Sequence, residues 1–136
     1  MNDVIINKTQ SIQRCIERVR EEYRLAGDKF REDYTRQDAA IMNITRACEQ
    51  AIDLANHVIK TGRLGLPTTS SESFVLLAEK RIISDGLAEK MRKMVSFRNI
   101  TVHQYQKMNI EIVEAIIQTG LSDLLEFTDC IHKFKP

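Results

Sequence analysis

The chain has 136 residues, the length of one domain that buries about two-thirds of its unfolded surface. Abundant Ile, Leu and Val exclude a disordered or collagen-like protein, and only 5 Gly and 2 Pro favour long helices with few turns. A net charge of +1 gives no global field that would draw the protein to nucleic acid. Any nucleic-acid binding therefore requires a local patch, or a surface built by several subunits.

The cysteines and the N-terminal residues indicate a reducing compartment. Cys15, Cys48 and Cys130 are odd in number, far apart and without metal-ligand spacing, so we expect buried small hydrophobic side chains. The first residues lack the basic and apolar regions of a signal peptide. No apolar stretch approaches the roughly 20 residues that span a bilayer. We therefore expect a cytoplasmic protein with no membrane partner.

Apolar residues at helical spacing predict two long helices in the first half of the chain. The first covers residues 3–25, with a stripe of Ile5, Thr9, Ile12, Ile16, Val19 and Tyr23. Gly27 interrupts this pattern, and residues 28–33 are polar enough for a loop or short turn. Thr35 resembles the cap of a capping box completed by Asp38. The helix that it opens is expected to end at Gly62 and to bury Ile41, Ile44, Cys48, Ala51, Ile52, Ala55, Val58 and Ile59.

The second half predicts three further helices after a long connection at residues 62–71. Ser71 is expected to cap a short third helix, Ser84 a fourth and Asn109 the last. The last helix carries a stripe of Val113, Ile116, Ile117, Leu121, Leu124, Phe127 and Ile131. No strand-like alternation appears. The sequence predicts one all-α domain over residues 1–136, an up-and-down bundle of four long helices and one short helix.

Residues 94–105, MVSFRNITVHQY, place four polar groups within the apolar pattern of the fourth helix: Arg98, Asn99, His103 and Tyr105. Arginine offers a planar fork of donors for phosphate, and histidine exchanges a proton near neutral pH. These are the two groups needed to cut an RNA backbone without a metal. In a straight helix, however, Arg98 and His103 lie about 140° apart and cannot reach one phosphate.

Two arrangements would remove this difficulty. The helix could end or kink near Thr101 and Val102, whose β-branched side chains weaken helices. Alternatively, the motifs of two protomers could face each other across the two-fold axis of a homodimer, or of a higher assembly. We favour the dimer, because a small bundle with a near-neutral surface offers no other obvious cleft.

Residues 98–105, RNITVHQY, match the R-x4-H-x-Y pattern of the HEPN superfamily and most resemble its HepT branch, the DUF86 family. The resemblance includes the preceding Met-Val-x-Phe run and extends to the Ser73–Leu77 segment and the final helix. It implies a HEPN-like fold and a ribonuclease toxin of a type VII toxin–antitoxin system. Such a toxin cuts RNA without a metal in a cleft formed by dimerisation. Its partner would be a small MntA-like nucleotidyltransferase antitoxin made alongside it.

The same resemblance assigns a role to each polar residue of the motif. Arg98 would stabilise the transition-state charge, and His103 would act as general base or general acid. Asn99 would orient the phosphate or His103. Tyr105 matches the tyrosine to which the antitoxin attaches AMP, and phosphates added beside Arg98 would occupy its anion site. We expect no cofactor and no metal, because neither His57 nor His132 has a partner at ligand spacing.

Other interpretations of these residues stay open. Arg98 and His103 could simply pair with acidic residues on a neighbouring helix, and Tyr105 could be an amphipathic residue at the core edge. The whole chain could instead be a non-catalytic helical subunit of a nucleotidyltransferase, or a structural dimeric bundle. The intact Arg, His and Tyr favour the ribonuclease, with RNA and not DNA as its nucleic-acid partner.

Overall fold

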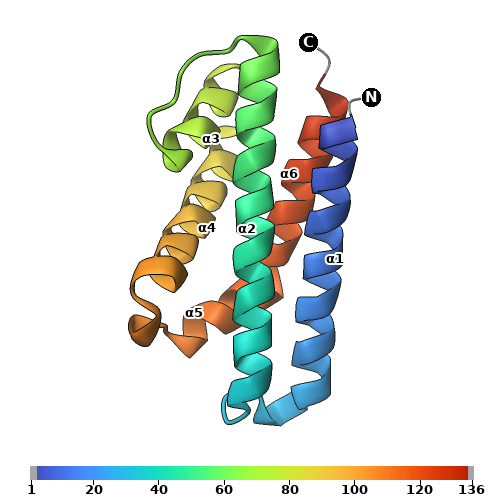
Figure 1. Cartoon of the computed structure of the whole chain (residues 1–136), viewed down its shortest axis with the longest axis vertical. Helices are drawn as coiled ribbons and strands as arrows, with labels where there is room; N and C mark the ends of the chain where they lie inside the picture. The colour runs from blue at the N-terminus through green and yellow to red at the C-terminus, as the bar shows by residue number, and fades with distance from the viewer. Residues whose placement is uncertain (1–2, 135–136) are drawn as a thin grey trace.

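The computed structural model describes residues 3–134, which form an up-and-down bundle of helices (Figure 1). The helices are α1 (Asp3–Ala26), α2 (Tyr34–Gly62), α3 (Ser70–Glu79), α4 (Asp85–His103), α5 (Ile110–Ala115) and α6 (Leu121–Lys133). A π-helical segment, Ile116–Gly120, joins α5 to α6, so the two form one long final helix. No β-strand occurs within residues 3–134, and the predicted all-α bundle is confirmed. Positions 1–2 and 135–136 of the expected domain lie outside the described residues.

Helix α2 is the centre of the bundle and contacts α1, α3, α4 and α6. It runs antiparallel to α1 over most of the length of both helices (Figure 1). Every residue of its predicted stripe is buried, and so are Thr9, Ile12, Ile16 and Val19 of the stripe on α1. The last helix buries its whole predicted stripe as well. Hydrophobic periodicity therefore predicted correctly which helix faces meet in the core.

Two predicted helix caps were wrong by two residues. Helix α2 is capped by the carboxylate of Asp33, which accepts a hydrogen bond of 3.1 Å from the Arg36 backbone, so Thr35 lies inside the first turn. Helix α3 is capped by Thr69 and not Ser71, because Thr69 accepts a 3.1 Å bond from the Glu72 backbone. The Glu72 carboxylate in turn accepts bonds of 2.8 and 2.6 Å from the backbone N–H and the hydroxyl of Thr68, which hold the start of α3.

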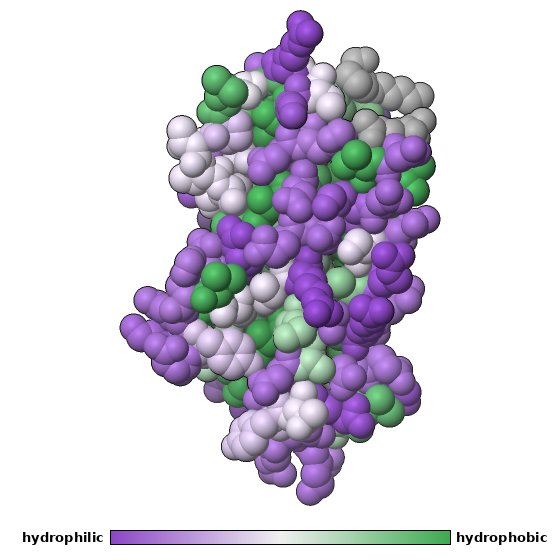
Figure 2. All heavy atoms as spheres, in the orientation of Figure 1, coloured by the Kyte–Doolittle hydropathy of each residue, from purple (hydrophilic) through white to green (hydrophobic). Residues whose placement is uncertain are grey.

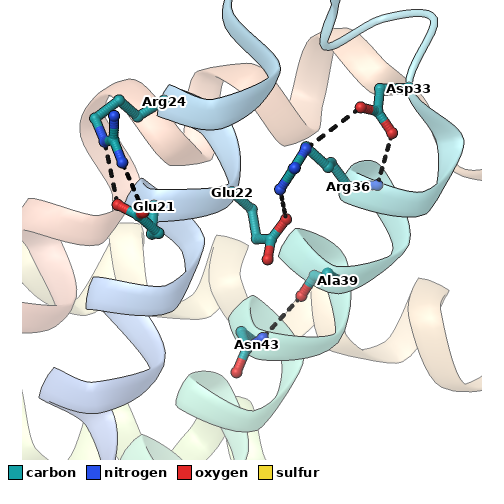
Figure 3. Close-up of polar contacts among 7 residues, drawn as sticks. All are labelled: Glu21, Glu22, Arg24, Asp33, Arg36, Ala39 and Asn43. Atoms are coloured by element: carbon teal, nitrogen blue, oxygen red, sulfur yellow. Dashed lines mark hydrogen bonds and ion pairs between the residues drawn. The ribbon is translucent and has the colours of Figure 1, made fainter.

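The start of α2 is fastened to α1 by the side chain of Arg36 (Figure 3). Its guanidinium lies 2.9 Å from the Glu22 carboxylate on α1 and 3.5 Å from that of Asp33. The first turn of α2 is therefore held both by its own cap and by an ion pair to the neighbouring helix. The cap and the ion pair therefore also fix the position of the second turn of α2.

The last helix packs closely against α4 at Gly120. A Cβ atom at this position would lie 3.1 Å from Ile116 Cγ2 and 3.4 Å from Met94 Sδ. The other two predicted caps are confirmed: Ser84 accepts a 3.0 Å bond from Leu87, and Asn109 accepts a 2.8 Å bond from Glu111. These contacts fix where α4 begins and how it lies against its neighbour.

The surface is largely polar on the face that Figure 2 shows, where hydrophobic side chains form only separate patches. Cys15 and Cys48 are buried as expected, and Cys130 is partly buried. None of the helices formed by residues 3–134 is both long enough and apolar enough to cross a membrane.

Candidate active site

The motif lies at the C-terminal end of α4, which packs its apolar side into the core through Met94, Val95 and Phe97. The helix ends at His103, close to the expected end, but it is continuous through Thr101 and Val102, so this alternative does not bring Arg98 and His103 together. The Thr101 hydroxyl donates a 2.8 Å bond to the Arg98 carbonyl and lies 3.1 Å from the Thr45 hydroxyl on α2. Because α4 stays helical through His103, that side chain and Arg98 diverge by about 140°.

Arg98 is held by residues from three helices. Its Nε donates to Asn99 Oδ1 at 3.0 Å, Nη1 to Glu49 Oε1 on α2 at 3.0 Å, and Nη2 to Ser70 Oγ on α3 at 3.4 Å. The side chain retains 18% of its exposure. A guanidinium has five N–H groups, so these bonds leave two donors for an anion such as phosphate.

The ion pair with Glu49 is the structural pairing that we considered for Arg98. This pair uses only one of the five N–H donors of the guanidinium. A partly exposed ion pair of this kind contributes about 1 kcal/mol or less to stability. Its larger effect is geometric, because it fixes one edge of the guanidinium plane while Asn99 fixes another. Asn99 therefore lies with Arg98 and not with His103.

His103 is exposed in the last turn of α4. Its imidazole has no hydrogen-bond or ion-pair partner among residues 3–134, in contrast to Arg98. Val102 beside it is 56% exposed. The end of α4 thus presents an imidazole and an apolar side chain to the outside of the bundle.

Tyr105 lies beyond α4, in the short 3-10 turn Tyr105–Lys107. Its phenol donates a hydrogen bond to Oδ1 of Asp38 in the second turn of α2. Partial burial and this bond to a carboxylate raise the pKa of Tyr105 to about 12. Both side chains line a recess of about 350 Å³ together with Tyr34, Gln37 and Met108.

Sequence reasoning missed three partners of the motif: Glu49, Ser70 and Asp38. Nothing in the sequence connects Glu49 or Ser70 to Arg98, because each contacts Arg98 only through the packing of another helix. Asp38 was noticed only as part of a capping box that does not form. A signal for Asp38 and Glu49 was their position on the edge of the apolar stripe of α2, where a charged side chain can reach a neighbouring helix.

The remaining histidines lie away from the motif. His132 Nε2 is 3.1 Å from the hydroxyl of Thr9, and His57 is half-buried on α2. Across the described chain, no three His, Cys, Asp or Glu side chains come together in a way that could hold a metal ion.

The all-α bundle, with the residue 98–105 motif at the end of one helix, fits the HEPN-like fold expected from the sequence. Comparison with known proteins identifies the family. The family described as ribonuclease HepT-like matches residues 12–131. The mRNA nuclease HepT of Shewanella oneidensis is 45% identical over 131 residues, which cover 96% of this chain and 98% of that protein. The protein belongs to the ribonuclease HepT-like family.

Solved structures support the same assignment. A tri-AMPylated HEPN toxin of Shewanella oneidensis, in complex with its MNT antitoxin, superposes with a TM-score of 0.93 at 43% identity, covering 98% of this chain and 100% of that one. A toxin–antitoxin complex with AMP-PNP has a TM-score of 0.90 at 44% identity, with coverage of 96% and 99%. The expected HEPN-like fold is thereby confirmed.

Proposed function

We propose that the protein is an endoribonuclease toxin that cuts RNA without a metal, with Arg98 and His103 as its catalytic groups. Membership of the ribonuclease HepT-like family supports this function, as does the name mRNA nuclease carried by a relative that is 45% identical. The observation that carries the proposal is the bracing of Arg98. Glu49, Asn99 and Ser70 hold its guanidinium in one orientation and leave two N–H donors for a phosphate.

The chemistry follows from these two side chains. The ribose 2′-hydroxyl attacks the adjacent phosphorus, and the bond to the 5′-oxygen breaks. His103 accepts the proton of the 2′-hydroxyl or donates one to the leaving 5′-oxygen, a role worth about 10²–10⁴ in rate. Arg98 stabilises the negative charge that develops on the phosphorane-like transition state. Asn99 acts by positioning Arg98.

We also propose that the complete site is built by two protomers. On one continuous helix Arg98 and His103 diverge, so the arginine of one protomer would work with the histidine of its partner. A two-fold contact at the end of α4 would also bury the exposed Val102 beside His103. Each dimer would then contain two equivalent sites.

Regulation by AMP addition is the third part of the proposal. Tyr105 is 45% exposed and lies just beyond the helix that carries Arg98, so an MntA-like nucleotidyltransferase antitoxin could reach it. The tri-AMPylated state of the superposed toxin supports this assignment. Each AMP adds negative charge near the end of α4 and would repel RNA phosphates. We place the protein, as one domain over residues 1–136, in the cytoplasm.

The catalytic assignment is tested by RNA cleavage in excess chelator, comparing the unaltered protein with Arg98→Ala and His103→Ala. Arg92→Ala is the matched control, because Arg92 is an exposed arginine on the same helix, paired only with Glu89 among the described residues. We expect both motif variants to lose cleavage and the control to retain it. Cleavage that survives both motif substitutions would overturn the assignment.

The composite site is tested by mixing the two inactive variants. In a dimer with shared sites, a hybrid of Arg98→Ala and His103→Ala chains retains one intact site, so random mixing restores about one quarter of full activity. If each protomer held its own complete site, the mixture would stay inactive.

AMP addition is tested by intact-mass analysis after co-expression with the nucleotidyltransferase. We expect additions of AMP mass that disappear in Tyr105→Phe and persist in Tyr34→Phe, since Tyr34 is exposed in the same recess. Additions that survive Tyr105→Phe would move the modification to another residue.

A further inference from the structure

The phenol of Tyr105 is bound to a carboxylate that comes from a distant part of the sequence. Its hydrogen bond to Asp38 Oδ1 joins the turn after α4 to the second turn of α2. We propose that Asp38 is the general base that accepts the phenolic proton of Tyr105 when AMP is transferred to it. This inference rests on the proposed modification of Tyr105, and it places part of the catalytic apparatus for that modification in the toxin chain itself.

Both partners of this bond are attached to well-held backbone. Asp38 follows the first turn of α2, which the Asp33 cap and the Arg36–Glu22 ion pair fasten to α1 (Figure 3). Tyr105 lies in a turn closed by a 3.0 Å bond from the Met108 backbone to the Tyr105 carbonyl. The carboxylate is therefore placed on the nucleophilic oxygen before any nucleotide arrives, as general base catalysis requires.

The surroundings of Tyr105 leave its oxygen dependent on such a base. The recess around it is lined by Tyr34, Gln37, Asp38, Ile41, Gln106, Met108 and Ile110. Asp38 and the distal Tyr34 are its only titratable groups besides Tyr105 within the described part of the chain, and no cation among those residues lines it to stabilise a phenolate. With its pKa raised to about 12 by burial and by Asp38, the phenol is ionised in only about one molecule in 10⁵ at pH 7.

The transfer step balances with this arrangement. Tyr105 Oη attacks the α-phosphorus of a nucleoside triphosphate, and the new P–O bond forms as the bond to the bridging oxygen of the β-phosphate breaks. Pyrophosphate leaves with that electron pair. As the phenolic oxygen bonds to phosphorus, its proton affinity falls below that of a carboxylate, so the proton passes to Asp38 Oδ1. Asp38 is exposed and returns the proton to solvent.

The test compares rates of AMP incorporation into the full chain by its nucleotidyltransferase with ATP, measured by intact mass between pH 6 and 9.5. Asp38→Asn keeps the size and the hydrogen-bond acceptor but cannot take up the proton. We expect it to slow the transfer by on the order of 10² at pH 7, with a deficit that narrows as rising pH supplies phenolate. Asp38→Glu should recover part of the rate, because it restores a carboxylate. Asp28→Asn, which removes an exposed charge from the turn before α2, should match the unaltered chain.

Three outcomes would overturn this inference and leave the proposed function unaffected. Asp38→Asn could be modified at the normal rate at every pH, it could be modified faster, or its rate could fall by a constant factor with an unchanged pH dependence. The second would make the Asp38 bond a restraint on Tyr105, and the third would make Asp38 a positioning residue only. Failure of the unaltered chain to acquire AMP would instead overturn the proposed function, and this inference with it. Circular dichroism of each variant checks that the bundle is folded.

Discussion

Replacing Arg98 by lysine separates the charge of the site from its shape. The substitution keeps one positive charge at the end of α4 but exchanges a planar fork of five donors for a compact ammonium with three. In the structure, the three guanidinium nitrogens contact Asn99, Glu49 and Ser70 at 3.0, 3.0 and 3.4 Å. A single ammonium nitrogen cannot reach all three and still present two parallel donors to a phosphate.

The magnitudes for Arg98→Lys follow from these contacts. Losing the bonds to Asn99 and Ser70, each worth about 1 kcal/mol net, should lower the free energy of unfolding by about 1–2 kcal/mol. The attraction that remains between the introduced ammonium and Glu49 offsets part of this loss. Loss of the paired donors at the transition state should cost about 3–4 kcal/mol, which lowers kcat/KM by on the order of 10²–10³. The activity should therefore fall much further than the stability.

The assay is single-turnover cleavage of RNA in chelator, alongside urea unfolding of the same samples. Arg92→Lys is the matched control, because the Arg92 side chain is 46% exposed and makes a surface pair with Glu89 at 3.1 Å. We expect the control to change neither quantity. If Arg98→Lys cleaves within about threefold of the unaltered chain, the site needs only a charge, and the argument from the guanidinium geometry fails.

Further predictions concern the core, the start of α4 and a buried thiol. Phe127→Ala removes a fully buried ring whose centroid lies 5.3 Å from that of Phe74, and should lower the free energy of urea unfolding by about 3–5 kcal/mol; a loss below about 1 kcal/mol would contradict the packing. Ser84→Ala removes the cap of α4 and should cost about 1 kcal/mol in the same assay, while Ser84→Asp should cost less. Burial raises the pKa of Cys48 from 9.0 to about 12, so above pH 9 the unfolded chain loses this proton before the folded chain does. The free energy of unfolding should therefore fall as the pH rises from 9 to 12. Urea unfolding at several pH values should show a smaller fall for Cys48→Ala than for the unaltered chain. An equal fall in both proteins would show that the Cys48 thiol is not its cause.

The sequence by itself determined the helices, their buried faces and the motif. Helical spacing of apolar residues is a local property of the chain, and it predicted the stripes that meet around α2. The ends of helices were less certain because several residues near each start can act as caps. Asp33 and Thr35 are both good cap residues, and only the turn from α1, with Arg36 held by Glu22, selects Asp33.

Only the tertiary structure decided how the motif is held. Glu49, Ser70 and Asp38 are separated from their partners by 49, 28 and 67 positions in the chain, so no local pattern could connect them. The sequence left open whether α4 breaks at Thr101, and the packed structure keeps it helical to His103. Local propensity acts over a few residues, whereas these contacts arise when α2, α3 and α4 bury their apolar faces together and bring polar side chains at the edges into reach.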